Sequence, residues 1–384
     1  MKKVKLALVG CGPRGVRVGK LFASYPQCEI TAIVDMFIGK AETVREDFKL
    51  PDAKLYTDYA KMLAESDVDT VFIASDPLSQ VDMACEAMEK GRHVCTEVPA
   101  AFSIDECWKL VETVERTGRK YQLMEQARYW GYTDECRKMN EAGVFGHICM
   151  AQGEYFHYNR NWGYWDDLDS GEKLNDLERP ANRNVVPNWR YKLLGEPIYY
   201  LPHTLSPILK ILDDRVVNVA CMGTRRQSYT YPESKLEWSD MEYALMHTAK
   251  DTVILAGAGF SMPCVRRGPL ECHWQEIRGT KASASTPRFP GDCFRLWKEG
   301  MATYESVPWS SVPLGANEEQ AKTGHGGTDF KPVDTFIQAI INDATPPMDV
   351  YLSVETAAPA ILAAESARKG GILLDVPDFR KGRG

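Results

Sequence analysis

The chain has 384 residues, more than one ordinary hydrophobic core holds, so two domains are expected. Its formal net charge of −7 gives no electrostatic reason to expect nucleic acid or a membrane surface as a partner. No stretch approaches the roughly 20 apolar residues of a membrane-spanning helix, and the apolar run from Val4 is too short for a signal peptide. We therefore expect a cytoplasmic protein.

Short apolar strands alternate with helical patterns over residues 1–125. Such alternation predicts a doubly wound parallel sheet. Ser103, with Glu106 three residues later, predicts a capping box at the start of the last of these helices. The expected strands cover 4–9, 29–34, 70–74, 93–96 and 120–124, and the expected helices cover 15–25, 38–48, 59–64, 79–90 and 104–117.

After residue 125 the pattern changes to one helix over 132–142 and then to strands rich in aromatic and β-branched residues. We expect a second, α+β domain over 126–384 with an open, mainly antiparallel sheet, through which a homo-oligomer would form. Residues 159–190 are expected to be a long aromatic and polar loop. Helices over 334–343 and 354–369 close the chain, and the last is a candidate for packing back on the first domain. The expected strands cover 148–158, 216–225, 243–248, 252–261, 271–278 and 282–286.

The cysteine pattern does not predict a metal site. There are eleven cysteines but no CxxC pair. Cys272 and His273 are adjacent, and Cys264 is the nearest other thiol, which is not the spacing of a zinc site. We expect reduced thiols, mostly buried.

A glycine-rich motif indicates a dinucleotide site of the Rossmann type. The run from Gly10 to Gly15 fits GxGxxG, follows a predicted strand and opens a predicted helix, which is the context that makes this motif informative. Its glycines allow a tight turn and a close backbone approach, and the pyrophosphate lies at the helix N-terminus. The expected dinucleotide-binding residues are Gly10, Gly12, Pro13, Arg14, Gly15, Asp35, Ser75, Glu97 and Pro99.

Asp35 decides which dinucleotide is expected. It ends the second strand, about 20 residues after the glycines, where a carboxylate accepts hydrogen bonds from ribose hydroxyls and repels a 2′-phosphate. Met36 and Phe37 follow, with no arginine to receive that phosphate. The cofactor is therefore predicted to be NAD rather than NADP.

These features, with the stretch from Gly91 to Pro99, resemble the glucose-fructose oxidoreductase and inositol dehydrogenase family (Gfo/Idh/MocA) over essentially the whole chain. In that family the stretch that corresponds to Gly91–Pro99 usually ends in Glu-Lys-Pro, and its lysine assists proton transfer from the substrate hydroxyl. Val98 stands at the lysine position here. The family's aspartate four residues before a histidine is also replaced, because Tyr199 stands four residues before His203.

Within the family, the chain is similar to the NAD-dependent α-N-acetylgalactosaminidases and related glycosidases. The stretch 324–330 matches the most specific motif of that branch, Gly-His-Gly-Gly-x-Asp-Phe. Looser matches are Glu97-Val98-Pro99 to its Glu-Val-Pro, Tyr155-Phe156-His157 to its Tyr-x-His, Trp189-Arg190 to its Trp-Arg, and Tyr200-Leu201-Pro202-His203 to its Tyr-Pro-Thr-His.

The resemblance implies a redox-neutral glycosidase. In that branch C3 of the sugar is oxidised by hydride transfer to NAD, the C2 proton is removed, the C1 substituent is expelled, water adds, and C3 is reduced again. Such a route needs several acid–base groups, for which histidine and tyrosine are suited. The candidate catalytic residues are Tyr155, His157, Tyr200, His203 and His325, and the candidate substrate residues are Glu97, Trp162, Arg190, Tyr199 and Asp329.

Two neighbouring interpretations stay open. Tyr155 and His157 share one face of a predicted strand. They are either two proton carriers that act on one substrate or a buried structural pair. The aromatic loop from Tyr158 to Asp167 suits either a sugar-binding wall or a dimer contact. For the whole protein, the alternatives to a glycosidase are a sugar or glycoside 3-dehydrogenase that releases a 3-keto product and a dinucleotide-dependent regulatory binding protein.

Overall fold

The computed structural model describes residues 3–158, 165–176, 178–188, 195–225, 229, 239–262, 270 and 272–383. The chain forms two compact units. The first unit comprises Met1–Glu125, Asp329–Val354 and Phe379–Gly384, and the second comprises Gln126–Thr328 and Glu355–Asp378. The chain therefore leaves the first unit, builds the second, and returns twice.

The first unit is built on a six-stranded parallel sheet in the order β3-β2-β1-β4-β5-β6. This is the doubly wound order, whose direction reverses between β1 and β4 and leaves a ligand site at the carboxyl ends of those strands. The predicted parallel sheet is confirmed, with β3 as an additional short strand. The strands are β1 (Val4–Val9), β2 (Cys28–Val34), β3 (Lys54–Tyr56), β4 (Thr70–Ile73), β5 (His93–Thr96) and β6 (Tyr121–Leu123).

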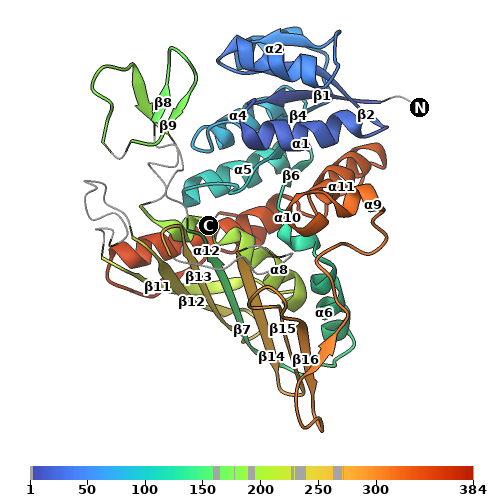
Figure 1. Ribbon diagram of the computed structural model, residues 1–384, viewed down its shortest axis with the longest axis vertical. Helices are drawn as coiled ribbons and strands as arrows, with labels where there is room; N and C mark the ends of the chain where they lie inside the picture. Colours follow the sequence, from blue (N-terminus) through green and yellow to red (C-terminus); the bar gives the residue numbers. More distant parts are fainter. Residues whose placement is uncertain are drawn as a thin grey trace. The chain divides into compact units, whose positions relative to one another are not determined.

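Six helices pack in the first unit, and one of them comes from the far end of the sequence (Figure 1). The predicted capping box is present, because Ser103 Oγ accepts from Glu106 N at 3.1 Å and Glu106 Oε2 accepts from Ser103 N at 3.0 Å. The helices are α1 (Pro13–Ser24), α2 (Ile38–Asp47), α3 (Tyr59–Glu65), α4 (Gln80–Glu89), α5 (Ile104–Thr117) and α11 (Phe330–Ile341).

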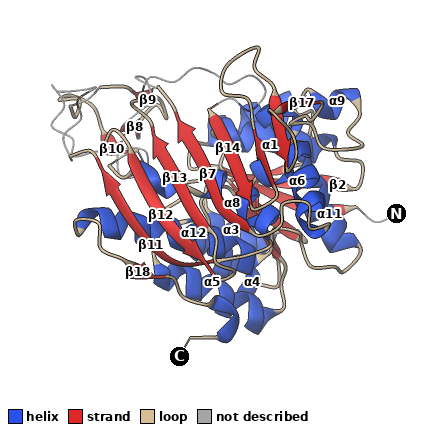
Figure 2. Ribbon diagram, turned by 90° about the horizontal axis from the view of Figure 1, so that it is seen from below, coloured by secondary structure: helices blue, strands red, loops and turns tan. Residues whose placement is uncertain are grey.

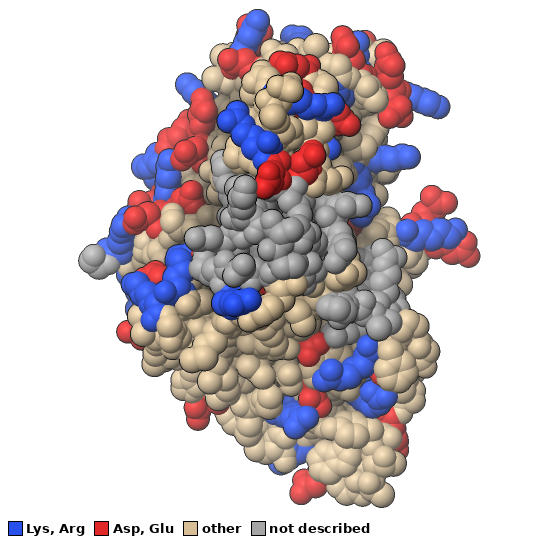
Figure 3. Space-filling view, turned by 60° about the vertical axis from the view of Figure 1, so that its left-hand side comes forward, with Lys and Arg blue, Asp and Glu red and all other residues tan. Residues whose placement is uncertain are grey.

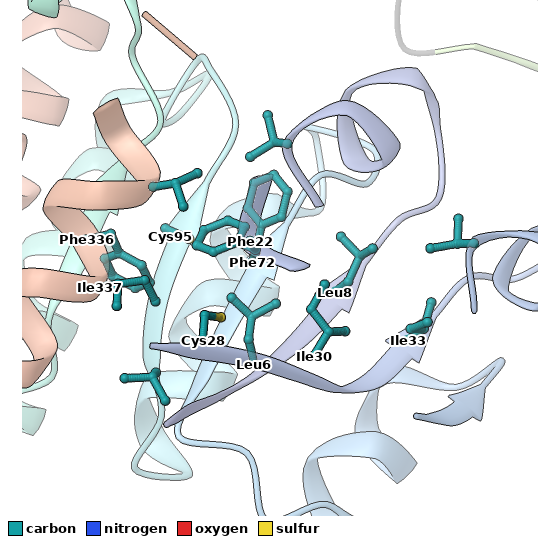
Figure 4. Close-up of a cluster of buried hydrophobic side chains, with 14 of the residues drawn as sticks. Leu6, Leu8, Phe22, Cys28, Ile30, Ile33, Phe72, Cys95, Phe336 and Ile337 are labelled. Atoms are coloured by element: carbon teal, nitrogen blue, oxygen red, sulfur yellow. The ribbon is translucent and has the colours of Figure 1, made fainter. Parts of the chain in front are cut away.

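The core of the first unit joins the sheet to α1 and α11 (Figure 4). Phe22 of α1 and Phe72 of β4 have ring centroids 5.3 Å apart. Phe336 and Ile337 of α11 are fully buried in the same cluster. Since burying a side chain of this size stabilises a fold by about 1.5–3 kcal/mol, α11 is an integral part of the dinucleotide-type domain although it follows the second unit in sequence.

The second unit contains a nine-stranded sheet in the order β17-β16-β15-β14-β7-β13-β12-β11-β18 (Figure 2). Within the described strand pairs of this sheet, β7 and β13 run parallel and all other pairs are antiparallel. The predicted open, mainly antiparallel sheet is therefore confirmed. The strands are β7 (Ile148–Phe156), β11 (Val216–Gly223), β12 (Glu242–Thr248), β13 (Val253–Gly259), β14 (His273–Gly279), β15 (Ala282–Ser285), β16 (Phe294–Lys298), β17 (Glu305–Val307) and β18 (Leu374–Asp375).

The helices of the second unit include α6 (Gly131–Glu141) and α8 (Pro202–Leu212), which pack on each other. Before α6 and α8 come two short 3-10 turns, η1 (Ala127–Tyr129) and η2 (Pro197–Tyr200). The long helix α12 (Val350–Arg368) begins in the first unit and continues into the second. The short elements α9 (Glu318–Ala321) and α10 (Gly324–Gly327) also belong to the second unit, whereas the 3-10 turn η4 (Phe379–Lys381) belongs to the first.

Part of the segment expected to be a long aromatic and polar loop is a small sheet, so that expectation is wrong for the described residues. The strands β8 (Trp165–Asp167), β9 (Lys173–Leu174) and β10 (Val185–Pro187) pair in the order β10-β8-β9. Trp165 is buried, and its Nε1 donates to Asp176 O at 2.9 Å. Strands of two or three residues are too short for their alternation to be visible in a sequence.

In the described part of the chain, the helices indicate no membrane-spanning segment, and the charges on the face in Figure 3 form no strongly charged patch. Over the residues that the structure describes, every helix is too short or too polar to cross a membrane. On the face shown in Figure 3, acidic and basic side chains are intermixed rather than gathered into a field of one sign.

Candidate functional site

The glycine-rich turn between β1 and α1 has backbone contacts that require glycine. Gly10 has φ +93°, and a Cβ there would lie 2.5 Å from Ala74 O. A Cβ at Gly15 would lie 1.9 Å from Gly10 O. Pro13 occupies the first turn of α1, where its missing N–H is not needed. Gly10 and Gly15 are therefore required by the fold itself.

Gly12 is different, because a Cβ there would meet no protein atom within 4 Å. Its carbonyl accepts the first helical hydrogen bond of α1, from Val16 N at 2.9 Å. The open side of Gly12 thus lies beside the N-terminus of a 12-residue helix, which attracts anions. This open cradle fits the pyrophosphate of a dinucleotide.

Asp35 is tied to the same turn. Its Oδ2 accepts from Cys11 N at 2.8 Å, and its Oδ1 accepts from Phe37 N at 2.9 Å. Both oxygens keep lone pairs for further donors, and the side chain is only half-buried. A carboxylate held in this way suits the hydroxyls of an adenosine ribose and repels a 2′-phosphate. The residues present therefore fit NAD.

Three predicted site residues from three separate motifs form one charged triad in the first unit. Arg14 donates to Glu97 Oε1 from Nη2 at 3.0 Å and from Nε at 3.3 Å, and to Asp329 Oδ2 from Nη1 at 3.4 Å. Burial alone would lower the pKa of Arg14, but the two carboxylates outweigh burial and raise that pKa above its ordinary value. Arg14, Glu97 and Asp329 are named below as the Arg14 triad.

The loop after β5 has a further anchor that the sequence did not indicate. Gln80 of α4 is buried, and its Nε2 donates to Glu97 O at 2.6 Å and to Pro99 O at 3.0 Å. The Glu-Val-Pro segment is thus held through its backbone carbonyls by the Gln80 amide and through the Glu97 carboxylate by Arg14. Ser75, the remaining residue predicted for this site, follows β4, and its Oγ lies 3.4 Å from Met83 Sδ.

A second group of predicted residues comes together in the second unit. Tyr155 is at its centre, with ring centroids 4.5 Å from His157, 5.2 Å from His203 and 6.4 Å from Tyr200. Phe260, next to β13, lies against Tyr200 at 4.8 Å and against His157 at 5.5 Å. The aromatic–histidine cluster consists of Tyr155, His157, Tyr200, His203, Phe260 and His273.

A glycine permits the close packing that assembles this cluster. Tyr155 is on β7 and His203 is in the first turn of α8. A Cβ at Gly153 of β7 would lie 2.2 Å from Thr204 Cγ2 of α8. Because residue 153 has no side chain, α8 approaches the strand closely enough to bring His203 beside Tyr155.

His273 belongs to the cluster but was not predicted as a site residue. It is directly opposite Tyr155 in the β14–β7 pair, with ring centroids 4.6 Å apart. The ring is also 4.8 Å from Trp130 and 6.2 Å from His203. The available sequence signal was its place in a predicted strand, but the register that puts it opposite Tyr155 cannot be obtained from one strand alone.

His325 is held through its backbone in the glycine-rich segment α10. Its φ and ψ are 53° and 44°, in the left-handed region. The carbonyl of His325 accepts from Trp130 Nε1 at 2.9 Å and from Thr328 Oγ1 at 2.8 Å. Trp130 thus contacts both His325 and His273, so one indole supports two of the histidines.

Tyr199 lies beside an ion pair, and two other predicted substrate residues are not described. Arg368 Nη1 lies 2.5 Å from Glu196 Oε2, and the Tyr199 hydroxyl hydrogen-bonds with both side chains. Burial raises the pKa of Tyr199. Trp162 and Arg190 lie outside the described residues. Within the described part of the chain, no group of three His, Cys, Asp or Glu side chains is placed to hold a metal ion.

Comparison with known proteins assigns both ends of the chain. The oxidoreductase family with an NAD-binding Rossmann fold (GFO_IDH_MocA) matches residues 4–125, and the glycosyl hydrolase 109 C-terminal domain matches residues 297–384. A glycosyl hydrolase family 109 protein of Phocaeicola vulgatus is 26% identical, covering 99% of this chain and 95% of that protein. An alpha-N-acetylgalactosaminidase of Bacteroides fragilis is 27% identical, covering 99% and 92%.

Solved structures show the same fold. The myo-inositol dehydrogenase of Lactobacillus casei, in complex with NAD(H) and myo-inositol, has a TM-score of 0.71 at 18% identity, covering 98% of this chain and 97% of that one. An oxidoreductase of Agrobacterium radiobacter in complex with NAD+ has a TM-score of 0.73 at 18% identity, covering 97% and 98%.

The chain is therefore an NAD-dependent enzyme whose first 125 residues carry the Rossmann domain of the Gfo/Idh/MocA oxidoreductase family. At its other end it carries the C-terminal domain of glycosyl hydrolase family 109, and its relatives include proteins named for that glycosidase family. The predicted family, fold class and NAD cofactor are confirmed.

Proposed function

We propose that this enzyme is a redox-neutral glycosidase that acts on a small glycoside. C3 of the sugar is oxidised, the C1 substituent is eliminated, water adds at C1, and C3 is restored. The observation that carries the proposal is the aromatic–histidine cluster, in which His157, His203 and His273 surround Tyr155. The family lysine is absent, because Val98 occupies its position.

The first unit would hold the dinucleotide through groups already described. Gly12 and the N-terminus of α1 would receive the pyrophosphate, and Asp35 would accept from the ribose hydroxyls. When bound, NAD supplies a hydride acceptor for a sugar carbinol and, once reduced, the donor that restores it. The Arg14 triad would keep the Glu-Val-Pro segment in place beside this site.

The cluster would handle the protons. One base must take the C3 hydroxyl proton, a second must take the C2 proton that the new ketone has made acidic, and a donor must return a proton at C2 after water has added. Tyr155, His157 and His203 are the side chains proposed for these roles. Glycoside and water become free sugar and aglycone, the C1–O bond is the one broken, and no external oxidant is consumed.

The test is incubation with a panel of aryl glycosides in D2O, following aglycone release and absorbance at the NADH band together. A redox-neutral enzyme should release aglycone over many turnovers without added oxidant and should place deuterium at C2 of the sugar. Stoichiometric NADH with a 3-keto sugar and no exchange at C2 would instead establish the dehydrogenase alternative. Absence of any turnover with dinucleotide bound would favour the regulatory binding protein.

A further inference from the structure

A cysteine contacts one of the proposed proton carriers. Cys272 Sγ lies 3.3 Å from His157 Nδ1, within hydrogen-bonding distance for a sulfur atom. The thiol is buried, with 8% of the residue exposed. The sequence had suggested only an ordinary reduced thiol at this position, so the contact adds a role that neither composition nor spacing indicated.

The backbone holds both partners in place. His157 N donates to Gly259 O at 2.8 Å, and Phe156 N donates to Cys272 O at 3.3 Å. The imidazole ring is also confined, because it lies edge-on to Tyr155 and stacked on Phe260. Strands β13 and β14 therefore flank His157 on both sides, and the ring has little freedom to turn away from the thiol.

A neutral imidazole carries its proton on one nitrogen and accepts on the other. Between a neutral thiol and a neutral imidazole, the nitrogen is the better acceptor and sulfur is a weak one. This difference favours a hydrogen bond donated by the Cys272 S–H to His157 Nδ1. In that arrangement the ring proton is on Nε2, the nitrogen on the other side of the ring.

We propose that Cys272 is a positioning residue that fixes His157 in the Nε2–H tautomer, so that His157 presents an N–H hydrogen-bond donor to the cluster rather than serving as one of its bases. The inference rests on the proposed function for the identity of the reaction, but the tautomer itself does not depend on it. The two base roles then belong to Tyr155 and His203, whose ring centroids lie 5.2 Å apart.

The first measurement needs no activity. Histidine labelled with nitrogen-15 gives ring signals that distinguish the tautomers, and the chain has only seven histidines. The His157 signals are assigned by their loss in H157Q. Wild type and C272S, which both have a donor, should show the Nε2–H form. C272A, which lacks a donor, should show a mixture of the two His157 tautomers. C272V repeats this test with a side chain that fills the space left by the thiol.

The second measurement is a double-mutant cycle on kcat. Loss of one neutral hydrogen bond worth about 0.5–1.5 kcal/mol corresponds to a two- to tenfold fall in kcat for C272A, with KM changed less and the rate recovered in C272S. In an H157Q background C272A should have no further effect. C149A, which changes the exposed cysteine of β7, is the control and should match wild type in tautomer and rate.

Two results would overturn the proposal. One is a wild-type His157 with its proton on Nδ1, and the other is a C272A spectrum identical to that of wild type. A fall in kcat that persists unchanged in the H157Q background would likewise assign Cys272 a packing role. If the protein shows the predicted tautomer but cleaves no glycoside, the positioning role stands and the proposed function fails, so the two failures are distinguishable.

Discussion

Removal of the Arg14 guanidinium should destabilise the first unit and weaken dinucleotide binding. Arg14 connects the glycine-rich turn to the Glu-Val-Pro segment and to the first residue after the glycine-rich stretch at 324–328. Arg14→Leu keeps an apolar stem of similar bulk but leaves Glu97 and Asp329 without this cation. Arg17, on the same helix and exposed, provides the matched control Arg17→Leu.

The magnitude follows from how the three side chains are buried. The Asp329 side chain is 1% exposed, that of Glu97 is 14% exposed, and that of Arg14 is 30% exposed. Breaking a buried ion pair costs about 3–5 kcal/mol and an exposed one about 0–1 kcal/mol. Because the Arg14 triad is buried to an intermediate degree, loss of the Arg14 cation should lower the free energy of unfolding by about 2–3 kcal/mol. That loss corresponds to a fall in Tm of roughly 4–12 °C for a domain of this size.

The assay is thermal unfolding and NAD titration of wild type, Arg14→Leu, Arg14→Lys and Arg17→Leu. Lysine keeps the charge but lacks the planar fork, so it should recover only part of the stability. Since the pKa of Arg14 lies above its ordinary value, the guanidinium keeps its charge well into the alkaline range, and the triad's contribution should not fall as pH rises from about 7 to about 9. The reasoning is refuted if Arg14→Leu and Arg17→Leu unfold within 2 °C of each other, about 0.5–1 kcal/mol in a domain of this size.

Further variants test the two sites and the fold. Asp35→Arg should weaken NAD binding and improve NADP binding in titrations, and a wild type that already prefers NADP would contradict this. Gly12→Ala should unfold normally but bind NAD weakly by calorimetry, because its Cβ enters space that only a ligand would fill. His203→Ala should lower aglycone release by about 10²–10⁴-fold with NAD affinity kept. Burial lowers the pKa of His93 to about 4. Stability should therefore be lost as pH falls from about 6.5 to 4, by about 2–3 kcal/mol once solvent screening of this half-buried ring is allowed for, and denaturant titrations of His93→Asn should lack that step.

Periodicity predicted the individual elements of the first unit well. β1, β5 and α5 begin and end at the predicted residues, because each has a clear apolar pattern and, for α5, a capping box. The prediction could not place α11 in the core of the first unit. A helical pattern reveals an apolar face, but not which sheet that face covers, and here the sheet is more than 200 residues away in sequence.

Motifs indicate candidate site residues but not which of them interact. The sequence predicts Arg14 for the cofactor, Asp329 for the substrate and Glu97 for both, and it does not predict that the three share one set of charge-assisted hydrogen bonds over separations of 83 and 315 residues. Cys272 and His273 were missed for a related reason. Their contacts depend on the register of β14 against β7, which a single sequence does not specify.

The surroundings of the three cluster histidines differ, and that difference is what the proposed chemistry needs. His157 contacts a thiol, His203 stands in the first turn of α8, and His273 is enclosed by Trp130 and Tyr155. Identical side chains in different environments acquire different acid–base roles. One lysine can serve one oxidation, in which a single hydroxyl proton leaves. An elimination followed by addition removes and returns protons at different atoms, so replacing the lysine with a set of distinct imidazoles is consistent with a cleavage that is neutral in redox terms.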